Sequence, residues 1–175
     1  MKPLVDYIRT IPDFPKPGIL FRDIVPLVED VDGFRQSIAE LKAGVSNWGP
    51  ITKVAGAEAR GFIFGAPLAL ELNVGFVPLR KPNKLPFETV SVEYELEYGT
   101  NRIEMHKDSI QPNDRVLLVD DLLATGGTVA ACRKLVESQG ATVVGAAFVI
   151  ELVDLKGREK LKGIPVFAPV QFEGE

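Results

Sequence analysis

The sequence is short of the residues that build disulfide frameworks and metal clusters. Its 175 residues include one cysteine, Cys132, and one histidine, His106. A single thiol excludes an internal disulfide, and nothing in the sequence resembles a zinc cluster. His106 stands beside Lys107 and Asp108, which favours a surface position over a catalytic one. Cys132 falls on the apolar face of an expected helix and is predicted to lie in the core.

Long apolar runs and an excess of basic charge are also missing. No stretch approaches the length that crosses a bilayer, and Met1 to Asp6 lacks the apolar run of a signal peptide. We therefore expect a cytoplasmic protein without a membrane partner. The net charge is −4, which argues against a nucleic-acid partner because phosphate contacts need clustered Lys and Arg. A local basic pocket for one small phosphorylated ligand remains compatible with that charge.

The length and composition suit one compact domain over residues 1–175, with enough apolar residues, 46%, for a sizeable core. Helical spacing or continuous apolar character predicts helices over residues 2–9, from Asp32 to Val45, over 62–72 and from Val129 to Gly140. Three prolines exclude regular structure over residues 11–18. Apolar runs or alternation predict strands over residues 53–56, 74–79, 90–98, 103–105, 115–119, 142–150 and 165–167. This order predicts an α/β fold with an open, mainly parallel, twisted sheet flanked by helices and an inserted β-hairpin.

The segment from Val116 to Thr128 carries the strongest chemical signal. A buried strand ends in Asp120 and Asp121, a loop of small residues follows, and then a helix begins. Ligands of open α/β sheets lie beyond the carboxyl ends of the strands. Small residues let backbone N–H groups approach an anion, and the helix start adds unsatisfied donors and the positive end of its dipole. The segment therefore predicts a cradle for a phosphate monoester, with the two acids placed to accept hydrogen bonds from sugar hydroxyls.

Two familiar phosphate motifs are absent from this segment. A P-loop needs a glycine-lysine pair before its Ser or Thr, whereas here Gly127 directly precedes Thr128, and no G-x-G-x-x-G is present. A strand, a capped turn and a helix without any ligand is the structural alternative, since Asp and Thr are common caps. Two adjacent acids at the end of an apolar strand have little structural purpose, which favours a ligand site.

The whole run resembles the motif with which type I phosphoribosyltransferases bind 5-phosphoribosyl-1-pyrophosphate (PRPP). Further segments resemble the adenine-specific branch of that family: residues 11–18, 21–24, 59–62, 80–86, 96–99 and 155–161. The resemblance implies a type I phosphoribosyltransferase fold. Its small hood would comprise residues about 1–30 with C-terminal residues, and its flexible loop and hairpin would span about 80–106.

The resemblance also implies an activity. Adenine and PRPP would give AMP and pyrophosphate in purine salvage, with Mg²⁺ as cofactor and a homodimer as the assembly. Two alternatives stay open: a phosphoribosyltransferase for another purine, and a PRPP-binding regulator without catalysis.

Roles for individual residues follow from the resemblance. The 5-phosphate of PRPP would bind Ala124, Thr125, Gly126, Gly127 and Thr128. Its ribose hydroxyls would bind Asp120 and Asp121, which also serve the metal directly or through water. The pyrophosphate would bind Glu58, Ala59, Arg60, Arg80 and Lys84. The adenine would bind Leu20, Phe21, Arg22 and Leu122.

Two catalytic residues and a lid residue complete the set that the resemblance implies. Glu97 would exchange a proton with a purine nitrogen, Arg60 would stabilise the leaving group, and Tyr98 would belong to the lid. Without the resemblance, the residues favour Glu97 as one of several acids on a solvated strand face, alongside Glu93 and Glu95. Asn83 stands where the family usually has glycine, and we expect it to keep the loop shape because Asn tolerates the left-handed region.

Overall fold

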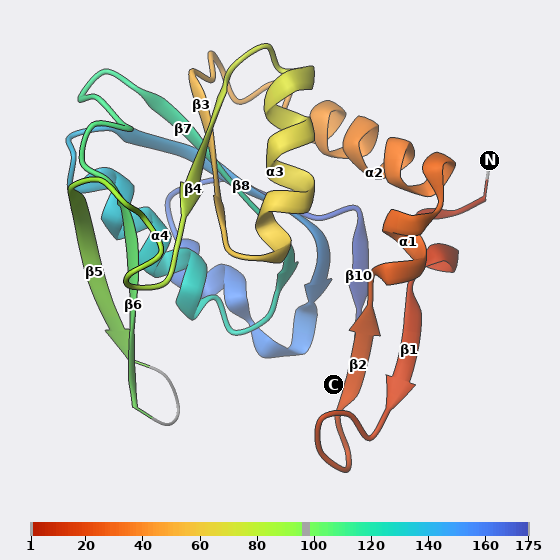
Figure 1. Ribbon diagram of the computed structural model, residues 1–175. Helices are drawn as coiled ribbons and strands as arrows, with labels where there is room; N and C mark the ends of the chain where they lie inside the picture. Colours follow the sequence, from red (N-terminus) through yellow and green to blue (C-terminus); the bar gives the residue numbers. More distant parts are fainter. Residues whose placement is uncertain (1, 96–98, 175) are drawn as a thin grey trace.

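The computed structural model describes residues 2–95 and 99–174, and its centre is a parallel sheet (Figure 1). The strand order is β10-β8-β7-β3-β4, with β9 also paired to β8, and every pair within this sheet is parallel. The strands are β3 (Lys53–Ala57), β4 (Gly75–Leu79), β7 (Arg115–Leu123), β8 (Thr142–Leu152), β9 (Val166–Phe167) and β10 (Val170–Phe172). The expected α/β fold with a mainly parallel sheet is confirmed.

Helices cover both faces of this sheet. The helices α1 (Val25–Glu29), α2 (Val31–Gly44) and α3 (Arg60–Glu71) lie on one face, and α4 (Gly127–Glu137) lies on the other (Figure 1). Asp30 begins α2, because its side chain accepts hydrogen bonds from the N–H groups of Asp32 and Gly33, both at 2.9 Å.

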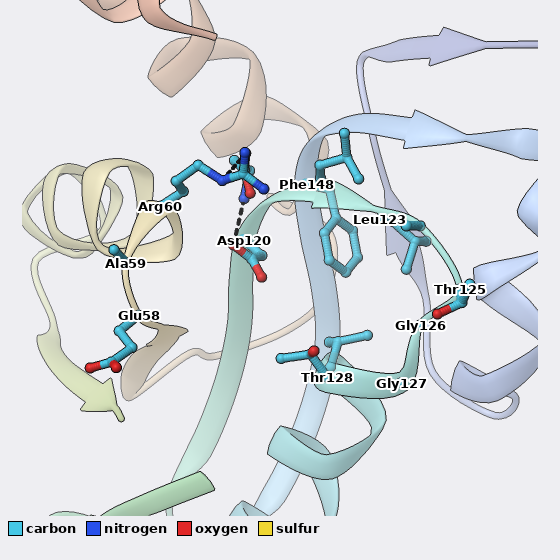
Figure 2. A pocket seen from close by; sticks show the side chains of 14 residues that line it. Glu58, Ala59, Arg60, Asp120, Leu123, Thr125, Gly126, Gly127, Thr128 and Phe148 are labelled. Atoms are coloured by element: carbon cyan, nitrogen blue, oxygen red, sulfur yellow. Dashed lines mark hydrogen bonds and ion pairs between the residues drawn. The ribbon is translucent and has the colours of Figure 1, made fainter. Parts of the chain in front are cut away.

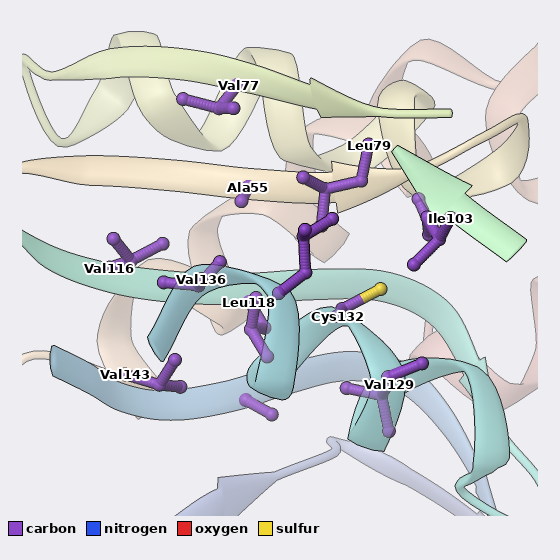
Figure 3. Close-up of a cluster of buried hydrophobic side chains, with 14 of the residues drawn as sticks. Ala55, Val77, Leu79, Ile103, Val116, Leu118, Val129, Cys132, Val136 and Val143 are labelled. Carbon is purple, nitrogen blue, oxygen red and sulfur yellow. The ribbon is translucent and has the colours of Figure 1, made fainter. Parts of the chain in front are cut away.

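The central strand β7 supplies side chains to two apolar clusters. Val116 and Leu118 pack into the cluster under α4, which includes the buried Cys132 (Figure 3), whereas Leu117 and Val119 pack into the cluster under α2 and α3. Successive side chains of a strand point to opposite faces, so an apolar run without alternation is the pattern of a strand buried on both sides. The predicted core position of Cys132 is confirmed.

Two antiparallel hairpins extend the sheet architecture. The first pairs β1 (Arg9–Pro12) with β2 (Leu20–Asp23), and the second pairs β5 (Thr89–Glu95) with β6 (Thr100–His106). The second hairpin is joined to the sheet edge by an antiparallel bridge between Arg80 and Glu104. Its alternating apolar residues Val90, Val92 and Tyr94 pack against the α4 cluster, as the period-two pattern predicted.

Several predictions about the chain termini were wrong. Residues 2–9 form only a short 3-10 helix, Leu4–Tyr7, and the chain then enters β1. Pro12 ends that strand within the segment expected to be irregular, which is possible because proline is tolerated at the end of an edge strand. The strand predicted over residues 165–167 is present as β9, but it is not the last one, because β10 follows it.

Two predictions about the central elements also need correction. α3 is not buried on nearly all sides: Leu70 is 81% exposed, because the helix packs one face on the sheet and leaves the other toward solvent. β7 does not stop before the acids but continues through them to Leu123, since its backbone stays paired with β8. Every helix in the described part of the chain is too short or too polar to cross a bilayer.

Candidate active site

A cavity of about 280 Å³ opens at the carboxyl ends of β3 and β7 (Figure 2). Three stretches line it: the start of α3 with the residues before it, the end of β7 with the loop that leads into α4, and one residue of β8. The lining residues are Glu58, Ala59, Arg60, residues 120–129 and Phe148. The structure therefore brings the predicted phosphate loop, both acids and the predicted pyrophosphate residues 58–60 together around one space.

The loop before α4 is shaped for close contact with an anion. Gly126 has φ +79°, a conformation that glycine adopts without strain, and a Cβ there would stand 2.6 Å from the carbonyl oxygen of Gly157. α4 begins at Gly127 without a side-chain cap. The first N–H groups of a helix have no partner within it, so they remain available to a ligand in the cavity.

The two acids lie side by side in the cavity wall, Asp121 buried and Asp120 partly buried. Asp121 is 2% exposed, and its Oδ2 atom accepts no hydrogen bond although Arg60 Nε lies 3.0 Å away at ion-pair distance. Asp120 Oδ1 accepts a hydrogen bond from the backbone N–H of Asp121 at 2.9 Å. Burial, and for Asp120 also the neighbouring Asp121 carboxylate, raises the pKa of both groups, that of Asp120 well above its ordinary value.

Arg60 reaches the acids because the start of α3 approaches β7 very closely. A Cβ on Gly61 would stand 3.0 Å from the carbonyl oxygen of Val119 and 3.2 Å from Asp120 Oδ1. Glycine at position 61 thus lets the helix backbone lie against the strand, with the Arg60 side chain directed toward Asp121. Within the predicted segment 59–62, Gly61 therefore allows the close approach and Arg60 contacts the acids.

The remaining predicted pyrophosphate residues are placed differently. Arg80 Nε donates a hydrogen bond of 2.6 Å to Glu58 Oε2, so Arg80 contacts the cavity wall through Glu58. Lys84 is absent from the described lining, and its carbonyl oxygen accepts from Arg80 Nη1 at 3.4 Å. The Glu58–Ala59 peptide is cis, and Asn83 adopts φ +64°, as expected for a residue replacing glycine.

A second cavity, of about 330 Å³, adjoins the first and is mainly apolar. It shares Arg60 and Leu122 with the first cavity, and its lining residues are residues 18–22, Arg60, Leu122, Leu152 and Leu155. All four residues predicted to bind a base, Leu20, Phe21, Arg22 and Leu122, thus face one space. Leu152 and Leu155 were not predicted, although Leu152 ends β8 and Leu155 follows it, and the carboxyl end of β8 meets that of β7 at the same sheet edge.

The first hairpin fixes the wall of the second cavity. Phe21 packs edge-on against Phe14 with ring centroids 5.1 Å apart. Arg22 donates from Nη1 to Thr10 Oγ1 at 2.7 Å, and its guanidinium lies 4.0 Å from the ring centroid of Phe172. These contacts hold the β1–β2 hairpin against the C-terminal part of the chain.

Glu97 and Tyr98 lie outside the described residues, so their roles stay predictions. Within the described part of the second hairpin, no residue of β5 or β6 lines either cavity. The rings of His106 and Phe87 have centroids 5.9 Å apart, and His106 Nε2 accepts a hydrogen bond from the backbone N–H of Phe87 at 3.4 Å. His106 lines neither cavity.

The same combination of fold and cavities occurs in known proteins. The phosphoribosyl transferase domain family matches residues 28–167. The adenine phosphoribosyltransferase of Halothermothrix orenii is 56% identical over 168 residues, which cover 96% of this chain and 98% of that protein. The chain belongs to the adenine phosphoribosyltransferase family.

Solved structures of the adenine phosphoribosyltransferase family match the architecture closely. The protein from Thermoanaerobacter pseudethanolicus gives a TM-score of 0.92 at 53% identity, covering 95% of this chain and 96% of that one. The Saccharomyces cerevisiae protein, solved with D-2,5-dideoxy-2,5-imino-altritol 1,6-bisphosphate and adenine, gives 0.88 at 42% identity over 95% of this chain and 96% of that one. The fold predicted from the resemblance is thereby confirmed.

Proposed function

We propose that this chain transfers the 5-phosphoribosyl group of PRPP to adenine and releases AMP and pyrophosphate, as an enzyme of purine salvage. The observation that carries the proposal is the junction of two unlike cavities at Arg60 and Leu122. One has an anion cradle and two adjacent acids, and the other is an apolar slot with an aromatic wall. A nucleotide with a phosphate at one end and a flat base at the other fits this pair.

The loop from Ala124 to Thr128 is the proposed site of the 5-phosphate. Its support is the helix start at Gly127, which has no side-chain cap, the positive φ of Gly126 and the hydroxyl groups of Thr125 and Thr128. Backbone donors and the helix dipole favour an anion at this position without a side chain that would fill the space.

Asp120 and Asp121 are the proposed partners of the ribose hydroxyls and of Mg²⁺. The described residues offer no cluster of three or more His, Cys, Asp or Glu side chains for a metal. Two adjacent carboxylates, one with an oxygen that accepts no hydrogen bond, suit an ion that keeps waters and substrate oxygens as its other ligands. Bound Mg²⁺ would supply charge neutralisation for the pyrophosphate.

The pyrophosphate is proposed to lie against Glu58, Ala59 and Arg60, with Arg80 and Lys84 completing the set. Arg60 stands in both cavities and so lies where the bond between the sugar and the leaving group must break. A cation held there by the Asp121 carboxylate stabilises the charge that develops on the leaving oxygen.

Adenine is proposed to stack on Phe21 with Leu122 opposite, while backbone groups at Leu20 and Arg22 read its edge. The base nitrogen then attacks the anomeric carbon as the bond to pyrophosphate breaks, which inverts the configuration from α to β. The transition state has oxocarbenium character, as in glycoside hydrolysis. Positioning in the two cavities and charge stabilisation supply most of the rate enhancement.

Glu97 is the proposed acceptor of the proton that leaves the base, and Tyr98 the lid residue. The support for both roles is the family resemblance of residues 96–99. Glu97→Ala should lower kcat far more than it weakens PRPP binding, and equal turnover in wild type and variant would remove Glu97 from the mechanism.

The assembly and setting follow from the same resemblance. We propose one phosphoribosyltransferase domain over residues 1–175, a homodimer as its assembly and the cytoplasm as its compartment. A hood of residues about 1–30 with C-terminal residues is supported by the contact between Arg22 and Phe172. The buried, unpaired thiol of Cys132 suits a reducing compartment. Sedimentation equilibrium tests the assembly: a mass of one chain would contradict it.

Product formation tests the activity. PRPP and Mg²⁺ are incubated with adenine, hypoxanthine, guanine or uracil, and the nucleotides are separated by chromatography. AMP from adenine alone is the expected result. Another nucleotide would keep the PRPP site but overturn the base, and absence of any product would overturn the proposed function.

A further inference from the structure

We propose that Lys160 is a binding residue for the 5-phosphate, an assignment that rests on the proposed function and adds a side-chain cation to the backbone cradle. Lys160 belongs to the short 3-10 helix Gly157–Leu161, which follows β8 and lies next to the phosphate loop. It is remote in sequence from the loop and absent from the residues predicted to form the site.

The Lys160 ammonium group converges with the other donors on one point. A Cβ built on Gly127 would stand 3.9 Å from Lys160 Nζ and 4.0 Å from Thr125 Oγ1. This point lies at the first residue of α4, where the helix N–H groups have no internal partner. An ammonium and a hydroxyl group thus lie close to the first residue of a helix, at a position where glycine adds no side chain, and all three features favour an anion.

The segment that carries Lys160 is anchored on both sides. Gly157 packs on the phosphate loop itself: a Cβ on it would collide with the carbonyl oxygen of Ala124. Arg158 donates two hydrogen bonds of 2.6 Å to the carboxylate of Glu151, which is 4% exposed, and a third of 2.9 Å to the carbonyl oxygen of Val166. Leu161 is buried in the α4 cluster. The backbone on either side of Lys160 is therefore fixed relative to the loop.

The residues that line the first cavity carry more negative than positive charge. Among the described lining residues, Glu58, Asp120 and Asp121 are acidic, whereas Arg60 is the one basic residue and already lies against Asp121. A phosphate monoester carries nearly two negative charges at neutral pH, and a helix N-terminus offsets about half of one. Lys160 has no ion pair with any described residue, so its charge is available to the phosphate.

The inference separates ligands by whether they carry the 5-phosphate. PRPP, AMP and ribose 5-phosphate would all contact Lys160, while adenine and inorganic pyrophosphate would not. The loss of one charge-assisted hydrogen bond at an exposed site weakens binding by about tenfold.

The test compares wild type with Lys160→Met, Lys160→Arg and the matched control Lys162→Met, an exposed lysine two residues further on. The measurements are KM for PRPP, KM for adenine, and inhibition constants for ribose 5-phosphate and for pyrophosphate. In Lys160→Met, we expect KM for PRPP and the constant for ribose 5-phosphate to rise about tenfold. The other two constants should stay within about twofold. Lys160→Arg should restore most of the loss, and Lys162→Met should match wild type.

Two outcomes would overturn the assignment. The first is unchanged PRPP and ribose 5-phosphate constants in Lys160→Met. The second is an equal rise in all four constants with a lower melting temperature, which indicates a structural role. Because wild type is measured first, these failures are distinct from a failure of the proposed function. If the proposed function fails, wild type forms no AMP. Binding of ribose 5-phosphate to wild type and Lys160→Met, measured by calorimetry, then still tests Lys160.

Discussion

The two cavities that meet at Arg60 and Leu122 are built in different ways. The larger part of the first comes from one continuous stretch, residues 120–129, whose backbone N–H groups and two adjacent acids face the space. The second is assembled from side chains at the ends of β2, β7 and β8. Where backbone forms the wall, a substitution that adds atoms collides with its neighbours. Where apolar side chains form the wall, a substitution that shortens one side chain removes only part of the contact area with the ligand. Substitutions should therefore have large effects in the first cavity and graded effects in the second.

Asp120→Asn should give the largest effect and should separate activity from stability. Removing the charge at the proposed ribose position is expected to lower kcat/KM for PRPP by at least about 100-fold. The same change should raise the melting temperature at neutral pH by about 2–4 °C, the shift that 1 kcal/mol gives in a domain of this size. The reason is that burial and Asp121 raise the pKa of Asp120 above its ordinary value.

The sign of the stability effect follows from proton linkage. A folded-state pKa above the unfolded value means that the ionised carboxylate opposes folding, so stability is lost as the pH rises through the folded pKa. The advantage of Asp120→Asn should therefore shrink as the pH falls and Asp120 becomes protonated. Thermal melts over a pH series provide the measurement, and a variant that melts below wild type at neutral pH would contradict the account.

Asp114 is a control for Asp120, because its pKa is shifted in the opposite direction. Burial alone would raise the pKa of Asp114, but hydrogen bonds from the Gln111 N–H and the Thr52 hydroxyl, with nearby Lys53, hold that pKa below its ordinary value. Its ionised form supports folding above the unfolded pKa, and this support is lost as the pH falls through the folded pKa. Asp114→Asn should thus lower the melting temperature at neutral pH and converge with wild type in acid.

Gly126→Ala should give the next largest effect, about 100-fold in KM for PRPP. A methyl group there meets the carbonyl oxygen of Gly157 at 2.6 Å and must also accept φ +79°. Gly163→Ala is the matched control, because Gly163 has φ +89° but nothing within 4 Å of the added atom. The control isolates backbone strain from collision. Equal PRPP constants in Gly126→Ala and wild type would show that the loop shape is not needed.

Phe21→Ala should act on the base alone and more weakly. Loss of one aromatic stacking face is worth about 1–3 kcal/mol per base, so we expect KM for adenine to rise about tenfold while KM for PRPP stays within about twofold. Steady-state kinetics with each substrate varied in turn separates the two constants. A larger change for PRPP than for adenine would reverse the assignment of the cavities.

Leu155→Ala should have the smallest effect, about threefold on KM for adenine, because Leu155 is partly exposed and forms only an edge of the second cavity. Leu70→Ala is the control, since Leu70 is exposed on α3 and lines neither cavity. If KM for adenine rises as much in Leu70→Ala as in Leu155→Ala, Leu155 does not belong to the proposed base site.

The contrast between the cavities also explains what the sequence could predict. Most of the first cavity is formed by one contiguous stretch, residues 120–129, so the small residues after Asp121 and the helix start at Gly127 were enough to predict an anion cradle. The second depends on contacts between distant segments, and Leu152 and Leu155 were missed because no local pattern marks them. Lys160 was missed for the same reason, since only the packing of Gly157 on Ala124 brings it to the loop.

Errors in the fold prediction came from tertiary packing that overrides local pattern. The proline-rich segment was expected to be irregular throughout, but pairing with β2 draws Ile11 and Pro12 into a strand. The apolar composition of α3 predicted burial on nearly all sides, whereas the sheet covers only one of its faces. The long period-two and apolar runs, in contrast, predicted strands where β5, β7 and β8 lie, because their side chains pack in register with the core, although β7 continues beyond its predicted end.

A crystal structure of the protein with AMP would test the central claim most directly. The account predicts the phosphate at residues 124–128 and the purine between Phe21 and Leu122, with the ribose between them beside Asp120 and Asp121. AMP bound in the opposite direction, or bound with its base outside the second cavity, would contradict it.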